Sequence, residues 1–277
     1  MTVALPYFDD IFERLARSGD SSYARMIHNV HWGYYTGPDE SEISDDMALA
    51  AAEAMTARVC LSARVANGKR ILDVGCGFGG TLSHLNERLS DCELVGLNID
   101  ERQIAQARKI VIARPSNTVR FEVGDACAPP FADGSFDVVT AVECIFHFPS
   151  RRTFFGEARR VLRPGGRLTV SDFVVNEAKM EEMTDWMEAN PTAQGSFFGS
   201  TTPAISSSTY ARLGRAKNLV LAADEDITAE TMPTYRWLEG LYRRQDLPEG
   251  VKTVEFLEEL ARRDFFQYRI LSFEATS

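Results

Sequence analysis

The sequence predicts an α/β protein built on a doubly wound, mainly parallel sheet. Short apolar runs alternate with helical patterns from residue 70 to residue 173, as expected for repeated strand–helix–strand units. The first run leads into a glycine-rich loop, RILDVGCGFGG (70–80), and the loop leads into the helical stretch TLSHLNERL. Open sheets of this kind bind ligands beyond the carboxyl ends of their strands, so we expect the functional site at that edge.

The glycine loop favours one kind of cofactor. Gly75, Gly77 and Gly80 satisfy the dinucleotide pattern G-x-G-x-x-G, which is a weak signal by itself. Asp73 stands at the end of the strand, where its carboxylate would repel a pyrophosphate and attract a ligand that carries an ammonium and a sulfonium group. The loop therefore predicts S-adenosylmethionine rather than a nicotinamide dinucleotide.

The flanking segments predict further elements in order. The Ala-rich stretch from Met47 to Ala66 has apolar residues at helical spacing and internal charges, so we expect an amphipathic surface helix rather than a membrane span. After Phe173, NEAKMEEMTDWMEAN predicts a helix that ends at Pro191, and residues 192–208 predict a mobile cap over the substrate. Then come a helix, a strand, two helices and a last strand: STYARLGRAKN, LVLAA, PTYRWLEGLYRR, VEFLEELARR and FQYRILSFEA.

Four motifs in this order resemble the class I S-adenosylmethionine-dependent methyltransferases. The family's first motif is an acidic residue followed by G-x-G-x-G, here Asp73, Gly75, Gly77 and Gly79. The resemblance extends to the small-molecule branch, which includes quinone, sterol and natural-product sugar methyltransferases. The other three motifs are VGLNID (95–100) at the end of the second strand, FEVGDACAPPFADGSFDVV (121–139) over the third and fourth strands, and ARRVLRPGGRLTVSDF (158–173) up to the fifth strand.

This resemblance implies a Rossmann-like, seven-stranded sheet whose last strand is antiparallel. A chain of 277 residues with 44% hydrophobic content can bury one such core with additions. We expect four parts: an N-terminal helical lid (1–66), a cofactor-binding core (67–175), a substrate cap inserted after the fifth strand (176–208), and the remainder of the same sheet domain (209–277).

The resemblance also assigns cofactor contacts near the first two strands. Asp73 would organise the methionine end of the cofactor, and the three glycines either approach the ligand or serve a tight turn. Asn98 ends the second strand where the family usually has an acidic residue for the ribose hydroxyls, and Asp100 is the alternative. Gln103 either contacts the ligand or begins a helix face.

Further cofactor contacts are expected after the third and fourth strands. By analogy with the family, Asp125 accepts a hydrogen bond from the adenine amino group, and a following backbone N–H, at Ala126, meets a ring nitrogen; an Asx turn is the alternative for Asp125. Phe131 either stacks on the purine or is a core residue. Glu143 is expected to support the loop or the cofactor.

The aromatic segment HNVHWGYY (28–35) resembles the lid that covers the cofactor in sterol and quinone methyltransferases. Tyr23, Trp32, Tyr34 and Tyr35 are the residues that would close over the sulfonium, since aromatic faces attract cations. The alternative is a permanent hydrophobic staple onto the sheet.

His147 is the candidate general base. It lies in AVECIFHFPSR (141–151), after the fourth strand, where related O-methyltransferases carry histidines, and an imidazole suits proton abstraction near neutrality. Asp172, at the end of the fifth strand, is the candidate for orienting that imidazole; a solvated aspartate is the alternative.

Composition removes several functions. A net charge of −10 argues against nucleic acid as a partner. The five cysteines have no metal or disulfide spacing, and no ligand cluster occurs in the motifs, so we expect neither a metal nor disulfides, and a cytoplasmic location. The N-terminal stretch lacks the features of a signal peptide. We expect no membrane span, and a homodimer stays open.

The predicted function is methyl transfer from S-adenosylmethionine to an oxygen or carbon nucleophile of a small, apolar or natural-product metabolite. Alignment of nucleophile, methyl and leaving sulfur would supply most of the catalysis. Apolar residues of the cap suggest aromatic or isoprenoid contacts: Trp186, Met187, Phe197 and Phe198. The alternative is a protein that binds the cofactor without transferring methyl, as in a cyclase or decarboxylase role.

Overall fold

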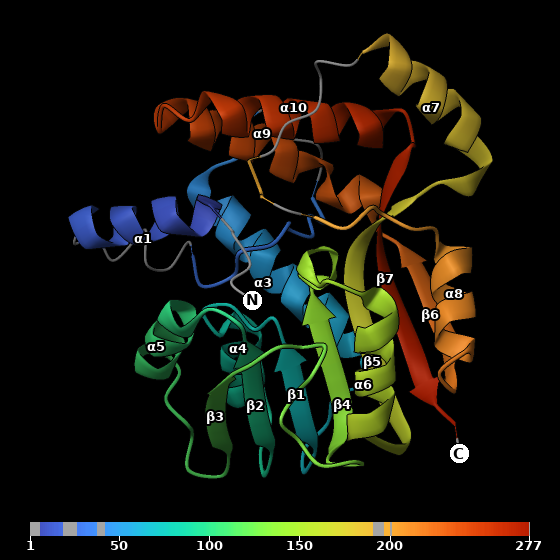
Figure 1. Ribbon diagram of the computed structural model, residues 1–277. Helices are drawn as coiled ribbons and strands as arrows, with labels where there is room; N and C mark the ends of the chain where they lie inside the picture. Colours follow the sequence, from blue (N-terminus) through green and yellow to red (C-terminus); the bar gives the residue numbers. More distant parts are fainter. Residues whose placement is uncertain (1–5, 19–26, 38–41, 191–196, 200, 277) are drawn as a thin grey trace.

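A seven-stranded sheet forms the centre of the computed structural model, which describes residues 6–18, 27–37, 42–190, 197–199 and 201–276. Its strand order is β3-β2-β1-β4-β5-β7-β6, and β7 is antiparallel to both of its neighbours (Figure 1). The predicted doubly wound sheet with an antiparallel last strand is confirmed. The strands are β1 (Arg70–Val74), β2 (Glu93–Asn98), β3 (Thr118–Val123), β4 (Phe136–Val142), β5 (Leu162–Val175), β6 (Leu219–Asp226) and β7 (Phe266–Ala275).

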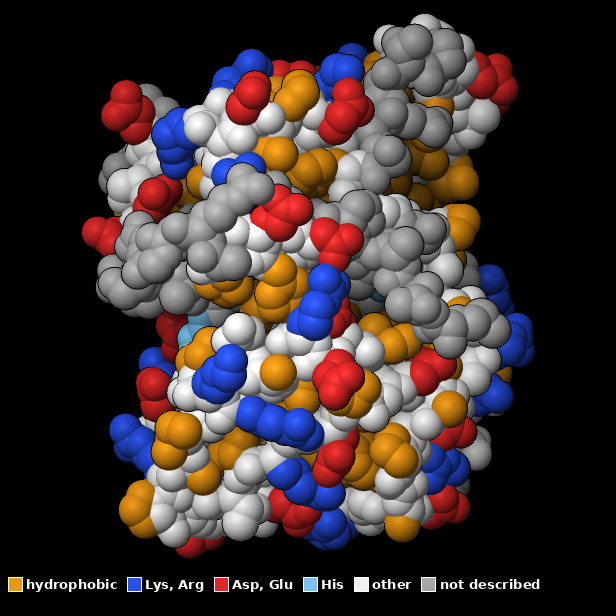
Figure 2. All heavy atoms as spheres, turned by 60° about the vertical axis from the view of Figure 1, so that its left-hand side comes forward, with side chains coloured by type: hydrophobic (Ala, Val, Ile, Leu, Met, Phe, Trp, Pro, Cys, Tyr) orange, Lys and Arg blue, Asp and Glu red, His pale blue; other side chains and the backbone are white. Residues whose placement is uncertain are grey.

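Helices lie on both faces of the sheet and above its carboxyl edge, with acidic and basic side chains interspersed on the face shown in Figure 2. Several begin at a serine whose hydroxyl accepts a backbone N–H, such as Ser44 before α3 and Ser150 before α6. The helices are α1 (Pro6–Ser18), α3 (Asp45–Ser62), α4 (Gly80–Arg88), α5 (Glu101–Ile110), α6 (Arg151–Val161), α7 (Met180–Ala189), α8 (Ser207–Arg215), α9 (Thr228–Arg244) and α10 (Pro248–Arg262), with 3₁₀ turns η1 (Ile145–His147) and η2 (Glu177–Lys179).

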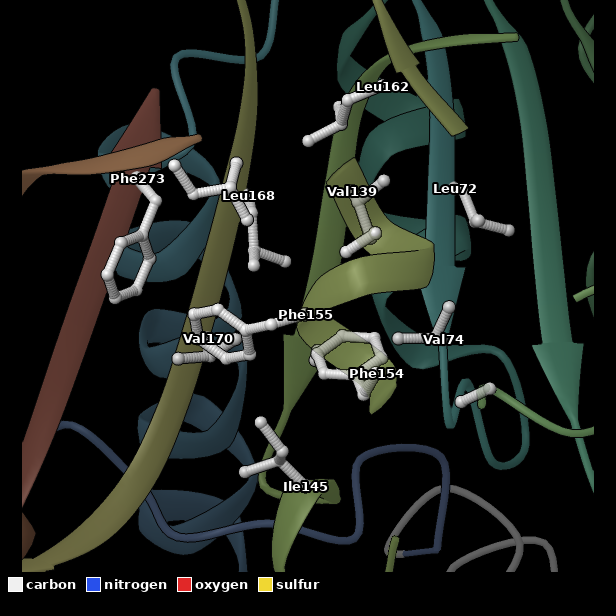
Figure 3. Close-up of a cluster of buried hydrophobic side chains, with 14 of the residues drawn as sticks. Leu72, Val74, Val139, Ile145, Phe154, Phe155, Leu162, Leu168, Val170 and Phe273 are labelled. Atoms are coloured by element: carbon white, nitrogen blue, oxygen red, sulfur yellow. The ribbon is translucent and has the colours of Figure 1, made fainter. Parts of the chain in front are cut away.

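The central strands of the sheet are buried on both faces, which explains why β1, β2 and β4 are mainly apolar, whereas the edge strands β3 and β6 keep exposed residues. On one face, Phe154 and Phe155 of α6 and Tyr210 of α8 pack on Val139 and Val170 of the strands (Figure 3). On the other face, α3, α4 and α5 cover β1 and β2. Two separate cores therefore fix the central strands, and with them the loops at their carboxyl ends.

A third layer lies beyond the carboxyl edge of the sheet. Helices α9 and α10 pack together above it, with α1 to one side (Figure 1). The buried residues Met55 and Val59 of α3 and Tyr235 of α9 join this layer to β7. The predicted helix between Met47 and Ala66 thus buries one face completely. No helix in the described ranges is long and apolar enough to cross a membrane.

Candidate active site

Two adjoining cavities open at the carboxyl edge of the sheet. We call the first the glycine-loop cleft, because the loop after β1 forms its floor. We call the second the aromatic cavity; it has a volume of about 600 Å³ and lies under α9 and α10. Five residues line both cavities, so the cavities adjoin at these side chains, and we call this shared wall the passage: Asn29, Val30, His31, Glu143 and His147.

Asp73 lies in the wall of the glycine-loop cleft with only 2% of its surface exposed. Its Oδ1 accepts a hydrogen bond of 2.7 Å from the hydroxyl of Thr140. Burial raises the pKa of Asp73 to about 7, against the lowering effect of its hydrogen bonds with Thr140 and Thr81. A ligand that brings a positive charge beside this carboxylate would restore its ionised form.

The glycines of the loop have different tasks. Gly75 and Gly77 line the cleft, and both have positive φ values, 67° and 52°. A Cβ on Gly75 would also lie 2.6 Å from the side chain of Cys144. Gly79 has a φ of 90° and precedes α4, and a Cβ there would press on Val111 and Phe121. Thus Gly79 serves the turn, while Gly75 and Gly77 lie against the cleft.

Two amide side chains form the cleft wall at the end of β2. The Nδ2 of Asn98 donates to the Oε1 of Gln103 over 2.5 Å, and both residues are more than nine-tenths buried. The Nε2 of Gln103 is buried without a hydrogen-bond partner. Asp100, the alternative ribose contact, instead caps α5 and binds Arg102, so the structure gives it a structural task.

The loop after β3 also borders the cleft, through Asp125 and Ala126. The Oδ1 of Asp125 accepts a hydrogen bond of 2.7 Å from the backbone N–H of Cys127, which is the Asx turn named as its alternative. Because the turn uses Oδ1, a role toward adenine falls to Oδ2. Phe131 packs on Phe136, with ring centroids 5.1 Å apart, and is a core residue here.

The aromatic segment (28–35) packs against α3 and α9. The backbone N–H of Gly33 donates to Thr234, and that of Tyr34 donates to Ala51. These bonds place Trp32 in the wall of the aromatic cavity, not of the glycine-loop cleft, and Tyr34 in neither wall. Their predicted cofactor contacts stay predictions, and the packing favours the staple. Tyr23 lies outside the described residues.

Glu143 ties this segment to the sheet. Its carboxylate accepts a hydrogen bond from the backbone N–H of Trp32 (2.8 Å) and another from the hydroxyl of Tyr268. Its φ of 48° lies in the left-handed region, which non-glycine residues rarely adopt and which often marks a functional position. Burial raises the pKa of Glu143 to about 8, and the nearby charge of Asp172 adds to this effect. The neutral acid is therefore well populated at neutral pH.

The aromatic cavity is lined mainly by apolar side chains from the lid segment, the cap, α9 and α10. Met187, Phe197 and Phe198 of the predicted cap are among them, whereas Trp186 stacks behind on Phe256. Its volume falls within the range of sites for drug-sized ligands. The other large apolar residues of the wall are Trp32, Phe146, Phe173, Trp237, Leu238, Leu241, Tyr242, Leu247, Phe256, Leu257 and Phe266.

Three of the four histidines of the chain border the passage or the cleft. His31 bonds through both ring nitrogens, to the carbonyl of Trp32 (3.0 Å) and the hydroxyl of Thr56 (3.1 Å), and burial lowers its pKa. His28 lines the glycine-loop cleft only, and His84 pairs with Glu53. His147, in the 3₁₀ turn η1 after β4, is the histidine whose position suits a proton acceptor between the two cavities.

Asp172 has a different setting from the one predicted. It is fully buried, accepts a hydrogen bond of 3.1 Å from Nη2 of Arg151, and accepts another from the hydroxyl of Tyr210. Burial raises the pKa of Asp172, while the charge of Arg151 opposes the shift. The solvated alternative is wrong. Asp172 is the counterion of Arg151, and its partnership with His147 stays a prediction. Arg151 and His31 lie within the segments AVECIFHFPSR (141–151) and HNVHWGYY (28–35), but the sequence analysis gave neither residue a role, because the neighbouring sequence does not indicate their partners.

An open parallel sheet with a glycine loop, a buried carboxylate and an adjoining apolar cavity defines an α/β enzyme that uses a nucleotide-type cofactor. The chain belongs to the class I S-adenosylmethionine-dependent methyltransferases: residues 72–170 match the methyltransferase domain family, and several relatives are at least 30% identical over most of their length. S-adenosylmethionine is therefore the cofactor, as predicted.

Three similar proteins illustrate this membership. The chain is 39% identical to methyltransferase GfsG of Streptomyces halstedii over 55% of its length, and it spans about half (53%) of that relative. It is 30% identical to 27-O-demethylrifamycin SV methyltransferase of Amycolatopsis mediterranei, over 80% of the chain and 76% of the relative. A geranyl diphosphate C-methyltransferase from Streptomyces coelicolor has the same fold, with a TM-score of 0.70, 19% identity, and coverage of 99% and 100% of the two chains.

The residues of the glycine-loop cleft fit S-adenosylmethionine on two observations. Asp73 is a buried carboxylate at the position where the ammonium end of the cofactor would lie. The Nε2 of Gln103 is a buried donor without a partner, and a ribose hydroxyl would satisfy it. Without such a ligand, the cleft leaves both groups poorly compensated.

Helix α1 lies against the glycine-loop cleft, and its role in the helical lid predicted for residues 1–66 stays a prediction. Phe8 and Phe12 pack on Phe78 of the glycine loop, and Phe8 lines the cleft. Arg102 holds the helix through an ion pair with Asp9 (2.7 Å) and through its position over the ring of Phe12, 4.6 Å from the centroid. These contacts place α1 against the glycine loop at the wall of the cleft.

The Arg102→Ala variant is expected to speed dissociation of S-adenosylhomocysteine about three- to tenfold, because an exposed ion pair and a cation–π contact each contribute up to roughly 1 kcal/mol. Stopped-flow fluorescence measures this rate. Arg120→Ala is the matched control, since Arg120 makes an ion pair with Glu93 and lies over Phe131, away from the cleft. Equal rates in the two variants would show that α1 does not gate the cleft.

Proposed function

We propose that the protein transfers a methyl group from S-adenosylmethionine to an oxygen or carbon nucleophile of a small, uncharged and mainly apolar metabolite. The observation that carries this proposal is the meeting of the two cavities at Glu143 and His147. A cofactor seated in the glycine-loop cleft supplies an electrophilic methyl group. The aromatic cavity then holds the acceptor on the far side of the passage.

The chain contributes alignment, exclusion of water and one proton acceptor. Apolar walls on both sides of the passage keep the reacting atoms dry, and a fixed in-line arrangement supplies most of the rate. His147 accepts the proton of a weakly acidic hydroxyl or carbon acid as the new bond to the methyl carbon forms. Asp172 acts at a distance, through Arg151, rather than on the acceptor.

The charge of the cavity wall supports an uncharged acceptor. Among the described lining residues, Arg151 is the one arginine or lysine, and its donors go to Asp172, Tyr210, Thr202 and Pro203. Glu143 and Asp172 are carboxyl groups in the same wall. A phosphate or carboxylate here would meet no available cation, and its burial would be costly.

We also propose a cytoplasmic location and no nucleic-acid partner. The five cysteines are free and four of them are buried, which fits a reducing compartment. The net charge of −10 and the interspersed charges in Figure 2 disfavour binding to a phosphate backbone. A homodimer stays a proposal that gel filtration with light scattering would test.

Release of S-adenosylhomocysteine is expected when the enzyme and S-adenosylmethionine are mixed with the organic-solvent extract of cells, and not with the aqueous extract. Geranyl diphosphate, which the Streptomyces coelicolor structure contains, is expected to remain unmethylated because Arg151, the one arginine or lysine among the described lining residues, is already paired with Asp172. The Asp73→Ala variant is the control. Cofactor binding without release in any fraction would favour the alternative of a protein that binds S-adenosylmethionine without methyl transfer.

A further inference from the structure

A buried hydrogen-bond network around Arg151 joins four segments of the chain. Arg151 begins α6 and is 8% exposed. Its Nε donates to the hydroxyl of Tyr210 in α8 (2.8 Å), and its Nη2 donates to Asp172 within β5 (3.1 Å). Its Nη1 donates to the hydroxyl of Thr202 (2.5 Å) and to the carbonyl of Pro203 (2.9 Å), both in the cap.

The network continues from the cap to the turn that carries His147. The backbone N–H of Thr202 donates to the carbonyl of Phe146 over 2.7 Å, and its hydroxyl donates to the same carbonyl over 3.1 Å. The rings of Phe146 and His147 lie 4.4 Å apart, centroid to centroid. The hydroxyl of Thr202 therefore accepts from Arg151 and donates to Phe146, which makes it the link between the guanidinium and η1.

Stability alone is a poor explanation for this network. A buried ion pair loses hydration on both partners, and replacing such a pair with apolar groups is often neutral or stabilising. The surrounding wall is mainly apolar, so apolar side chains in place of the charged pair would also fit this environment. What a charged network supplies is a directional arrangement, since each donor of a guanidinium fork requires an acceptor at a set angle.

We propose that Arg151 is a positioning residue that fixes the cap and the 3₁₀ turn η1 in one arrangement, so that His147 stays at the passage between the two cavities. Arg151 does not touch the reacting atoms in this role. It sets the relation between the wall that holds the acceptor and the group that removes its proton. The inference rests on the proposed function for the task of His147, but the mechanical link is a property of the chain alone.

The test uses Thr202→Val, which removes one hydroxyl at nearly constant volume and leaves the pair of Arg151 and Asp172 intact. We expect hydrogen exchange to accelerate about tenfold in residues 201–206 and also in residues 145–148, and the ¹³C-labelled His147 resonance to shift. The dissociation constant for S-adenosylhomocysteine should stay within about twofold, because no residue of the glycine-loop floor changes. Thr153→Val, at an exposed position of α6, is the matched control.

Arg151→Met leaves the carboxyl of Asp172 buried without its cation and can unfold the chain, so Arg151→Lys is the second variant. Lysine keeps the charge but not the planar fork, and we expect it to loosen the same two segments. Unchanged exchange in residues 145–148, with or without loosening of the cap, would overturn the proposal. These measurements need no acceptor. Failure of wild-type protein to bind S-adenosylhomocysteine would reject the proposed function and would leave the exchange result interpretable.

Discussion

Replacing His147 with alanine is expected to lower turnover by about 10² to 10⁴, the usual contribution of a positioned general base, when proton removal limits the reaction. Cofactor affinity should remain nearly constant, because His147 borders the cleft without belonging to the glycine loop. Initial rates of S-adenosylhomocysteine formation with the active organic fraction, together with calorimetric titration of S-adenosylhomocysteine, measure the two effects separately.

His147→Gln is the companion variant, since it keeps a polar side chain of similar size but cannot take up the proton. Exogenous imidazole should restore part of the rate to His147→Ala and none to the wild type. Glu143 is the carboxyl group of the passage, and burial raises its pKa to about 8. A rate that survives in both variants would show that alignment alone drives transfer, or that the acceptor is already an anion or an amine.

The part of the site that depends on local sequence was predictable. Asp73 is the second-last residue of β1, and Gly75 and Gly77 follow that strand, so their place at the sheet edge follows from the strand and the loop alone. Asn98 is the last residue of β2, and Asp125 comes shortly after the end of β3. For these residues, closeness to a strand in the sequence is enough to predict a position at the edge of the sheet.

The parts that depend on distant segments were not predictable. Asp172 looked like a strand-end residue available to His147, but it is fully buried against Arg151 and Tyr210, the latter 38 positions away in the chain. The side chain of Trp32 turns to the aromatic cavity because Gly33 binds Thr234 of α9. The sequence near these residues does not indicate either partner.

The order of the strands was likewise not predictable from the local sequence. The resemblance to the family implied an antiparallel last strand, and the structure places β7 between β5 and β6. This insertion brings Tyr268 beneath Glu143, where its hydroxyl supports the carboxylate that holds Trp32. Periodicity can predict that β7 is a strand, but the register that aligns Phe173 with Tyr268 is set by packing of the whole sheet.

Removal of the Asp73 carboxylate is expected to weaken binding of S-adenosylhomocysteine by about 1.5 to 3 kcal/mol, the typical loss for a charge-assisted contact, with the fold intact. The Asp73→Ala and Asp73→Asn variants, titrated by calorimetry at pH 8, test this expectation. Asp137→Asn is a control, since Asp137 is a carboxylate on β4 outside the cleft lining. Unchanged affinity, or binding of NADH in place of S-adenosylhomocysteine, would show that the loop has another ligand.

The same carboxylate makes cofactor binding depend on pH in a direction that burial fixes. Burial raises the pKa of Asp73 from its usual 3.8 to about 7. Between these two pH values, the folded, ligand-free chain holds a proton that the unfolded chain has lost. The contribution of Asp73 to stability therefore declines as the pH rises from about 4 to about 7. The ammonium group of the ligand favours the ionised carboxylate, so binding must release that proton. Affinity for S-adenosylhomocysteine is therefore expected to fall about tenfold per pH unit below 7 and to level off above it. Asp73→Asn should abolish this slope, and a wild-type affinity independent of pH between 5.5 and 8 would mean that the carboxylate does not meet the ammonium.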